Sequence, residues 1–274
     1  MKKIIVPVDF SDTAFNAARY AGNMAEFYGA DLWLYHAYEM MVPATEYGYS
    51  YVSEREMQEA AMQELESFKN KIQSGLRRVI NIYTKASNNN LSGGLEELCR
   101  EIEPDLVVMS LSGKNALTRL IVGSNTIRAI HHLSYPVLVL PHEATFIPVR
   151  KIGFACDYEN GLEHDSIEAL KVIVHDLHAE LYVVNIKDIN APASTEEVKE
   201  NSYTGELLQS MKPSYQTIVS AGVSNGINWF AEKEKVDWVV MVPRKHNLAE
   251  KIFSKSQTKD LLHHTHLPVL CMHN

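Results

Sequence analysis

A group of small residues near the middle of the chain has the types and spacing that suit an anion. Residues 105–109 are an acid followed by an apolar, largely β-branched run, which is typical of a buried parallel strand. A polar loop follows, from Ser110 to Gly113, and then Gly123-Ser124, with Ser124 expected to cap a helix running to His132. Unpaired N–H groups and the helix dipole both favour negative charge at such a helix start. The sequence therefore predicts an anion site here.

Alternating strands and helices place this loop within the chain. The same patterns predict strands over residues 2–9, 30–38, 79–84, 105–109 and 135–140. Helices are expected from Ser11 or Asp12 to Phe27, over residues 53–73, and from Gly93-Gly94 to Ile102. Strands that alternate with helices indicate an α/β fold with a doubly wound parallel sheet. In such a sheet a ligand sits beyond the carboxyl ends of the strands, where the strand order reverses.

The second half of the chain repeats the first. The strand Lys3-Ile-Ile-Val-Pro-Val-Asp9 returns as Lys151-Ile-Gly-Phe-Ala-Cys-Asp157. Residues 105–140 align without gaps on residues 237–272, and twelve of the 36 positions are identical, where roughly two would be expected by chance. Pro141 and Pro148 bracket a short connector between the copies. The chain is therefore predicted to be a tandem duplication.

Composition narrows the classes of function. A length of 274 residues suffices for two domains with separate cores, and a net charge of −8 argues against a nucleic-acid partner. No apolar run approaches the ~20 residues needed to span a bilayer, and residues 1–9 enter a strand without a signal-peptide pattern. Three widely separated cysteines are interpreted as buried, reduced thiols. We expect a cytoplasmic protein with no membrane and no nucleic-acid partner.

The spacing Ser110-x2-Gly113-x9-Gly123-Ser124 resembles the G-x2-G-x9-G-(S/T) nucleotide loop of the universal stress protein family. Three further segments support the resemblance, namely Val6-Pro-Val-Asp9, Tyr35-His-Ala37 and Pro136-Val-Leu-Val-Leu140. It implies two flavodoxin-like domains in tandem, each with a five-stranded parallel sheet, related by a pseudo-twofold axis. We assign these domains to residues 1–143 and 148–274. The resemblance also implies that the domains pair through their last strands within the chain, and it leaves a homodimer open.

The same resemblance implies a site for ATP, ADP or AMP, with magnesium as a companion ion. Val8 and Asp9 would then hold the adenine edge and Ala37 would contact the base, while Met109 and Ser110 line the ribose. The phosphates would be held at the start of the predicted helix. The full set of expected ligand-binding residues is Pro7, Val8, Asp9, Ala37, Met109, Ser110, Gly113, Gly123, Ser124 and Asn125.

Each of these assignments has a structural alternative. Asp9 is also placed to cap the entry of the first helix, and Gly123-Ser124 is equally compatible with a simple turn and N-cap. Ser110 replaces the first glycine of the motif. If that position requires a positive φ, serine costs about 1–2 kcal/mol relative to glycine. Its hydroxyl would instead be able to bond a ribose or a phosphate.

The second copy departs further from the motif. Met241-Val-Pro-Arg-Lys245 replaces the glycine loop and Lys255-Ser256 replaces Gly-Ser. Pro243 removes an amide donor, and Lys245 puts a side chain where bare backbone is required. Asp157 is retained, but it has no such loop to act with. We interpret residues 148–274 as a degenerate domain that pairs with a domain carrying a near-complete loop.

Two other chemistries are less favoured. Adjacent histidines, such as His131-His132 and His263-His264, point about 100° apart on a helix and do not chelate as i, i+4 pairs do. No arrangement for nucleophilic catalysis is recognisable. The leading hypothesis is a nucleotide-binding stress-response protein with at most slow hydrolysis. The alternatives are a ligand-free dimerisation or scaffold protein and an adenine-nucleotide enzyme.

Overall fold

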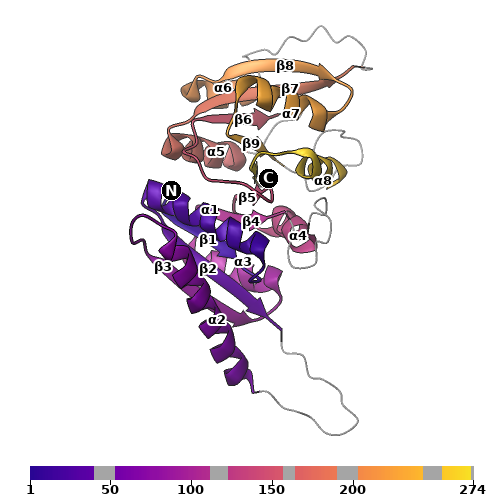
Figure 1. The fold of residues 1–274 in the computed structure, drawn as a ribbon. Helices are drawn as coiled ribbons and strands as arrows, with labels where there is room; N and C mark the ends of the chain where they lie inside the picture. The colour runs from indigo at the N-terminus through magenta and orange to yellow at the C-terminus, as the bar shows by residue number, and fades with distance from the viewer. Residues whose placement is uncertain (40–52, 112–122, 157–163, 190–202, 243–254, 273–274) are drawn as a thin grey trace, which may run out of the picture.

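The chain folds into two halves with the same succession of strands and helices (Figure 1). A computed structural model describes residues 1–39, 53–111, 123–156, 164–189, 203–242 and 255–272. The first half contains β1 (Lys3–Pro7), α1 (Asp12–Tyr28), β2 (Asp31–Tyr38), α2 (Glu54–Ser74), β3 (Ile82–Asn88), α3 (Leu91–Ile102), β4 (Leu106–Ser110), α4 (Ser124–His132) and β5 (Val137–Leu140). The second contains β6 (Lys151–Ala155), α5 (His164–Leu177), β7 (Glu180–Asp188), α6 (Tyr203–Leu208), the short 3-10 helix η1 (Gln209–Met211), β8 (Ser214–Ser220), α7 (Val223–Glu234), β9 (Trp238–Met241), α8 (Lys255–His264) and β10 (Val269–Cys271).

All ten strands belong to one sheet, in the order β3-β2-β1-β4-β5-β10-β9-β6-β7-β8. Neighbours within each half are parallel, whereas β5 and β10 meet antiparallel in the middle. The order reads the same from either edge once the halves are matched, as a pseudo-twofold axis between β5 and β10 requires. This arrangement confirms the predicted fold class of two doubly wound, flavodoxin-like units in tandem.

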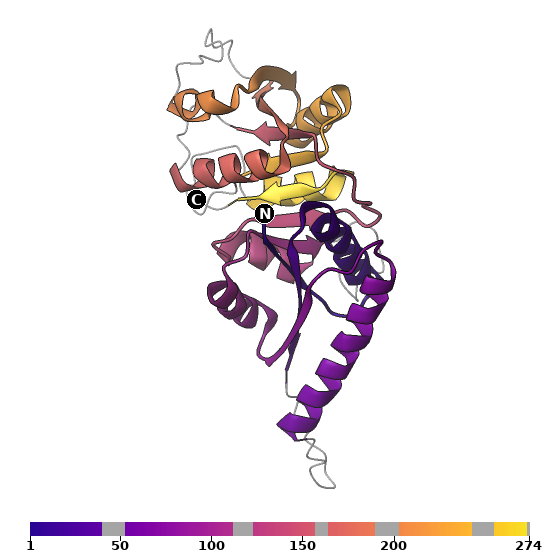
Figure 2. The same cartoon turned by 90° about the vertical axis from the view of Figure 1, so that its left-hand side faces the viewer.

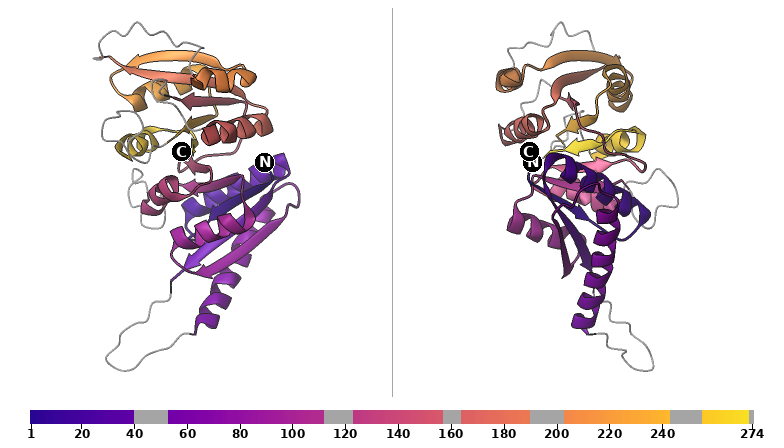
Figure 3. Two further views of the ribbon diagram at one scale, coloured as in Figure 1. Left: turned by 180° about the vertical axis from the view of Figure 1, so that it is seen from behind. Right: turned by 60° about the vertical axis from the view of Figure 1, so that its left-hand side comes forward.

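Each half forms three layers, because alternate strand residues point to opposite faces of the sheet. In β1, Ile4 and Val6 pack in the cluster beneath α1 and α2, whereas Ile5 packs beneath α3 and α4. Figure 2 shows the first sheet between these two helix layers. Figure 3 shows the second half stacked on the first and α2 directed away from the junction. The central strands are buried on both faces, as their apolar runs predict.

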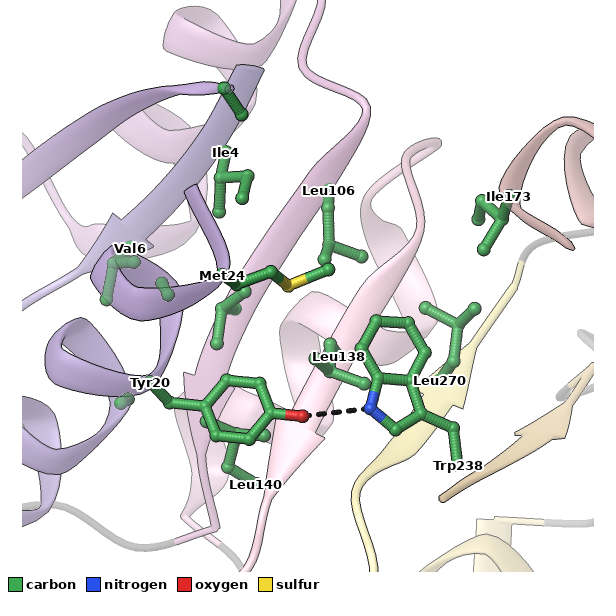
Figure 4. Close-up of a cluster of buried hydrophobic side chains, with 14 of the residues drawn as sticks. Ile4, Val6, Tyr20, Met24, Leu106, Leu138, Leu140, Ile173, Trp238 and Leu270 are labelled. Atoms are coloured by element: carbon green, nitrogen blue, oxygen red, sulfur yellow. Dashed lines mark hydrogen bonds between the residues drawn. The ribbon is translucent and has the colours of Figure 1, made fainter. Parts of the chain in front are cut away.

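A buried hydrogen bond crosses the junction between the halves. The indole Nε1 of Trp238 in β9 donates to the hydroxyl of Tyr20 in α1, with 2.9 Å between the atoms. Both side chains are almost fully buried, and Leu138 and Leu270 lie beside them (Figure 4). The N-terminal amine of Met1 also forms an ion pair with the carboxylate of Asp176 in α5. Polar contacts therefore supplement the apolar packing between the halves.

Most predicted elements are present, and two predicted details are wrong. The third strand was expected over residues 79–84, but β3 begins at Ile82 and continues to Asn88. Val79 is 89% exposed, and Ile82 is the residue that pairs with Leu32. Ser124 is the first residue of α4 and not its cap; the cap is Gly123, which has no side chain for that role.

We expect Gly94→Ala to destabilise the protein, because α3 passes close to β2 at this position. A Cβ on Gly94 would lie 1.9 Å from the hydroxyl oxygen of Tyr35, which is buried and 2.6 Å from Ser87 Oγ. Overpacking of this kind typically lowers the free energy of unfolding by about 1–3 kcal/mol. Denaturant titration measures the loss.

Gly75→Ala is the matched control, since its Cβ would meet nothing closer than 3.4 Å. Placing Gly94→Ala in a Tyr35→Phe background removes the hydroxyl oxygen and should recover part of the loss. Equal stability of Gly94→Ala and the wild type would show that the close approach is wrong.

Candidate functional site

The strand order reverses between β1 and β4, so the crevice for a ligand lies at their carboxyl ends. These two strands are parallel neighbours, with Ile5 opposite Val107. The segment that begins with Val8 and the segment that begins with Ser110 therefore leave the sheet at the same edge. The structure thus brings together two stretches about a hundred positions apart in the chain.

Asp9 lies just beyond β1 and helps to start α1. Its Oδ1 accepts hydrogen bonds from the backbone N–H of Ser11, at 3.1 Å, and from the Ser11 hydroxyl. Ser11 in turn caps α1, because its Oγ accepts from the N–H of Ala14 at 3.2 Å. Asp9 therefore supports the start of α1 indirectly, by holding Ser11, which is the cap itself. The carboxylate is half-buried, and it stays at the edge where a ligand would enter.

Phe10, which directly follows Asp9 in the chain, packs against two other rings. Phe10 has a φ of 60°, in the left-handed region, and its ring centroid is 4.5 Å from that of His36 and 5.7 Å from that of Phe68. His36 Nδ1 is 2.8 Å from the carbonyl oxygen of Val8. A carbonyl only accepts, so Nδ1 must carry the proton. Phenylalanine does not favour positive φ, so no residue signal reveals this turn in advance.

The other expected residues of the adenine and ribose end are partly or fully covered. Val8 is 4% exposed, and its N–H donates to the carbonyl of Tyr35 at 2.8 Å. Ala37 is half-buried in β2 opposite Ser87. The side chain of Met109 is buried in the apolar cluster beneath α3 and α4. Pro7 is the last residue of β1. The side chain of Met109 is therefore not available to a ligand.

Two hydrogen bonds tie the start of α4 to the end of β4. The N–H of Gly123 donates to the carbonyl of Leu111 at 2.7 Å, and Thr126 Oγ1 donates to the carbonyl of Ser110 at 2.9 Å. Thr126 is 4% exposed. We call this pair of bonds the β4–α4 clamp. The sequence analysis did not single out Thr126. A hydroxyl residue three positions after Gly123, in the first turn of the predicted helix, is the signal that would have found it.

The first turn of α4 has no side-chain cap among the described residues. Ser124 and Asn125 are exposed at this helix start, so their N–H groups face the same edge as Asp9. Gly113 and residues 114–122 lie outside the described residues. The structure thus gathers Gly123, Ser124 and Asn125 at the carboxyl end of β4, as the sequence predicts for an anion site.

Ser110 does not have the strained backbone that a glycine position would suggest. It is the last residue of β4, pairs with Leu140, and is not among the described non-glycine residues with positive φ. The conditional cost of 1–2 kcal/mol for a serine here therefore does not apply. Crowding of a ligand by its side chain, or a hydrogen bond from its hydroxyl, stays open.

The arrangement defines a doubly wound α/β fold with a helix start at the crossover. The family model of universal stress proteins matches residues 1–141 and again residues 149–273. The chain therefore belongs to the universal stress protein family, as a member with two copies of the domain.

Comparison with individual relatives agrees with this assignment. A universal stress protein of Methanocaldococcus jannaschii is 28% identical over 143 residues, which is 51% of this chain and 81% of the relative. A crystal structure of a universal stress protein from Archaeoglobus fulgidus superposes with a TM-score of 0.67 at 15% identity, covering 99% of this chain and 96% of the other. A functionally unknown protein from Pseudomonas aeruginosa superposes with a TM-score of 0.60 at 16% identity, covering 100% and 92%. These two likenesses show the fold.

We expect Thr126→Val to lower the free energy of unfolding by about 0.5–1.5 kcal/mol, because it removes a donor to the Ser110 carbonyl while keeping the side-chain shape. Thr126→Ser retains the hydroxyl and should restore the bond. Urea titration of the variants gives the comparison.

Thr258 in α8 is a matched control, because it occupies the equivalent position in the second copy. Its hydroxyl is fully buried and has no hydrogen-bond partner among the described residues. Thr258→Val should leave stability unchanged or raise it slightly. Equal losses for both valine variants would mean that the clamp contributes nothing specific.

Proposed function

We propose that this protein binds an adenine nucleotide, ATP, ADP or AMP, at the carboxyl edge of its first sheet and acts as a stress-response protein. In this proposal Asp9 and the backbone of Val8 hold the base, and the backbone at Met109 and Ser110 meets the ribose. The N–H groups at the start of α4 hold the phosphates, with magnesium as their counter-ion. Any hydrolysis is slow, since no catalytic base is identified.

The observation that carries the proposal is a glycine that the fold itself does not need. Gly123 has an ordinary φ of −60°, and a Cβ there would meet nothing closer than 3.6 Å among its protein neighbours. Neither its backbone conformation nor packing against the described residues accounts for the missing side chain. A ligand that approaches the uncapped start of α4 would account for it, because bare backbone lets a phosphate reach the N–H groups.

The surroundings of Asp9 suit the base. Phe10, the residue after Asp9, packs against His36, and both rings are only partly buried, so they are available to pack against a purine. The burial of Tyr35 raises the pKa of its phenol, with a smaller opposing effect from its hydrogen bond to Ser87, so this side chain stays neutral at the strand end. In this proposal the aromatic rings contact the base, and the uncapped start of α4 binds the phosphates.

We propose that only the first half binds nucleotide, and that residues 148–274 form a degenerate partner of the domain at residues 1–143. The second copy lacks the β4–α4 clamp at Thr258, the counterpart of Thr126. Val242 stands in the place of Ser110, and Pro243 follows it in the sequence. In the same proposal, pairing of β5 with β10 inside the chain substitutes for pairing between two copies, although a homodimer through another surface stays compatible with it.

The scaffold alternative has one observation in its favour. Asp9 already accepts two hydrogen bonds from Ser11, the cap of α1, so its support of that cap explains its presence without a ligand. A protein that keeps the fold but binds no nucleotide would retain Asp9 for that reason. It would not need the bare backbone at Gly123.

We also propose a cytoplasmic location. Cys99, Cys156 and Cys271 are buried free thiols, and burial together with nearby Glu96 raises the pKa of Cys99 to about 12. Unreactive thiols of this kind suit a reducing compartment. The helices in the described part of the chain are all too short or too polar to cross a bilayer. The net charge of −8 supports the expectation that nucleic acid is not a partner.

Gly123→Ala tests the proposal. The variant should keep the unfolding free energy within about 1 kcal/mol, because its φ suits alanine and a small loss of capping preference opposes a small entropic gain. Its affinity for ATP should fall at least tenfold in calorimetric titration with magnesium, because the new methyl group blocks the approach to the helix start.

Gly222→Ala is the matched control. Gly222 also caps a helix without a side-chain bond, α7 in the second half, and a Cβ there would meet nothing closer than 3.8 Å. It should bind ATP as the wild type does. A wild type that gives no heat with ATP, ADP or AMP would favour the scaffold alternative.

A further inference from the structure

A cavity lies at the junction of the two halves, apart from the proposed nucleotide site. Its volume is about 820 Å³, within the usual range for small-molecule sites. Because β5 and β10 are antiparallel, the carboxyl edge of the first sheet meets the amino edge of the second here. The first half supplies Tyr20, Leu111, residues 141–145 and Ile147. The second half supplies residues 235–238, 262–263 and 265–268.

The buried part of the lining is apolar and rigid. Tyr20 and Trp238 are held together by their hydrogen bond (Figure 4), and Val236 and Leu262 are almost fully buried. Burial raises the pKa of Tyr20 far above its usual value, so the phenol stays neutral. In front of this packed layer, Leu111, Ile147 and Leu267 are the accessible apolar residues of the lining, and they suit the apolar or aromatic body of a ligand.

The polar part of the lining is uncommitted. Six side chains have no hydrogen-bond or ion-pair partner among the described residues, namely His142, Glu143, Thr145, Lys235, His263 and His266. Asp237 differs, because its Oδ2 accepts from the N–H groups of Arg150 and Lys151 at 2.7 and 2.9 Å. Of these six groups, three imidazoles, an ammonium and a hydroxyl can donate a hydrogen bond, and one carboxylate cannot.

We propose that this cavity is a second ligand site, which takes a small organic anion with an aromatic or aliphatic body. The head group, a carboxylate or sulfonate, lies among Lys235 and the three histidines. The body lies against the accessible apolar lining residues Leu111, Ile147 and Leu267. Nothing in this assignment depends on nucleotide binding at the first sheet.

The duplication supplies independent support for the sign of the charge. By the alignment that relates Asp105 to Asp237, Lys235 stands where the first copy has Glu103, and His266 stands where it has Ser134. Both positions lie at the amino edge of a sheet, and each copy has such an edge. Only the amino edge of the second copy lines this cavity. At both positions the cavity side carries the more basic residue.

The negative groups near the cavity are largely engaged. The C-terminal end of α8 points to it, but the carbonyl of Asp260 accepts from His264 Nδ1 at 2.9 Å and that of Leu261 accepts from the N–H of Thr265 at 2.9 Å. Burial lowers the pKa of His263, with smaller lowering by Lys259 and His264 and an opposing effect of Asp260. The pKa shift keeps free His263 neutral to a lower pH than usual.

Binding should therefore strengthen as the pH falls. Histidine is the side chain that gains charge between pH 8 and pH 6, and each protonated imidazole in the cavity attracts the anion. The lining also includes the carboxyl groups of Glu143 and Asp237. The pH dependence is thus a signature of the histidines.

The experiment uses 1-anilinonaphthalene-8-sulfonate as the probe and the full chain as the protein. Calorimetric titration should give one site at pH 6.0 and at least tenfold weaker binding at pH 8.0. Near-ultraviolet circular dichroism at pH 6.0 verifies that the protein is folded, because partly unfolded proteins also bind this dye.

Variants then locate the site. His263→Gln/His266→Gln should abolish most of the pH dependence, and Lys235→Met should weaken binding at both pH values. His132→Gln/His175→Gln is the matched control, since both histidines are exposed and lie away from the cavity. Absence of binding at pH 6.0, or equal behaviour of the cavity and control variants, would overturn the proposal.

Discussion

The antiparallel contact between β5 and β10 is the interaction on which the rest of the molecule depends. It consists of three residue pairs, with Val139 opposite Val269 at one end, and every residue in both strands is buried. A strand of three residues is too short to stabilise an open sheet edge in water. Each half therefore covers the other's last strand, and α1 adds Tyr20 to the contact through Trp238. Separation of the halves would expose two apolar strand edges at once.

The two copies share the hydrogen bonds that close the amino edge of each sheet. At the amino edge, Asp105 Oδ2 accepts from the N–H groups of Lys2 and Lys3, as Asp237 Oδ2 does from those of Arg150 and Lys151. The first lysine of β1, Lys3, also donates to the carbonyl of the last residue of α3, and Lys151 of β6 donates in the same way to the last residue of α7. These contacts hold strand ends together. The carboxyl edges of the two sheets differ, because the hydrogen bond from Thr126 to Ser110 has no counterpart at Thr258 among the described residues.

The fold was predictable because burial on both faces produces long apolar runs, and duplication doubled that signal. The start of β3 was not, since the apolar residue Val79 lies outside the sheet. The helix start at Gly123 was predictable from spacing, but its cap was misassigned because glycine leaves no side-chain signal. The left-handed turn at Phe10 and the cavity between the halves depend on tertiary contacts that no local pattern encodes.

The core of the second half shows what kind of change duplication tolerated. In β6, Gly153 stands where β1 has Ile5, and a Cβ at Gly153 would lie 2.7 Å from Cε1 of Phe230. Phe230 in α7 stands where α3 has Leu98, so a larger helix residue fills the space that a strand residue has vacated. Volume-conserving exchange of this kind preserves packing at little cost in stability. In the described part of the second half, the core is retained while Thr258 forms no counterpart of the Thr126 hydrogen bond. This is what our proposal of a degenerate structural partner requires, because packing and binding are then maintained by different residues.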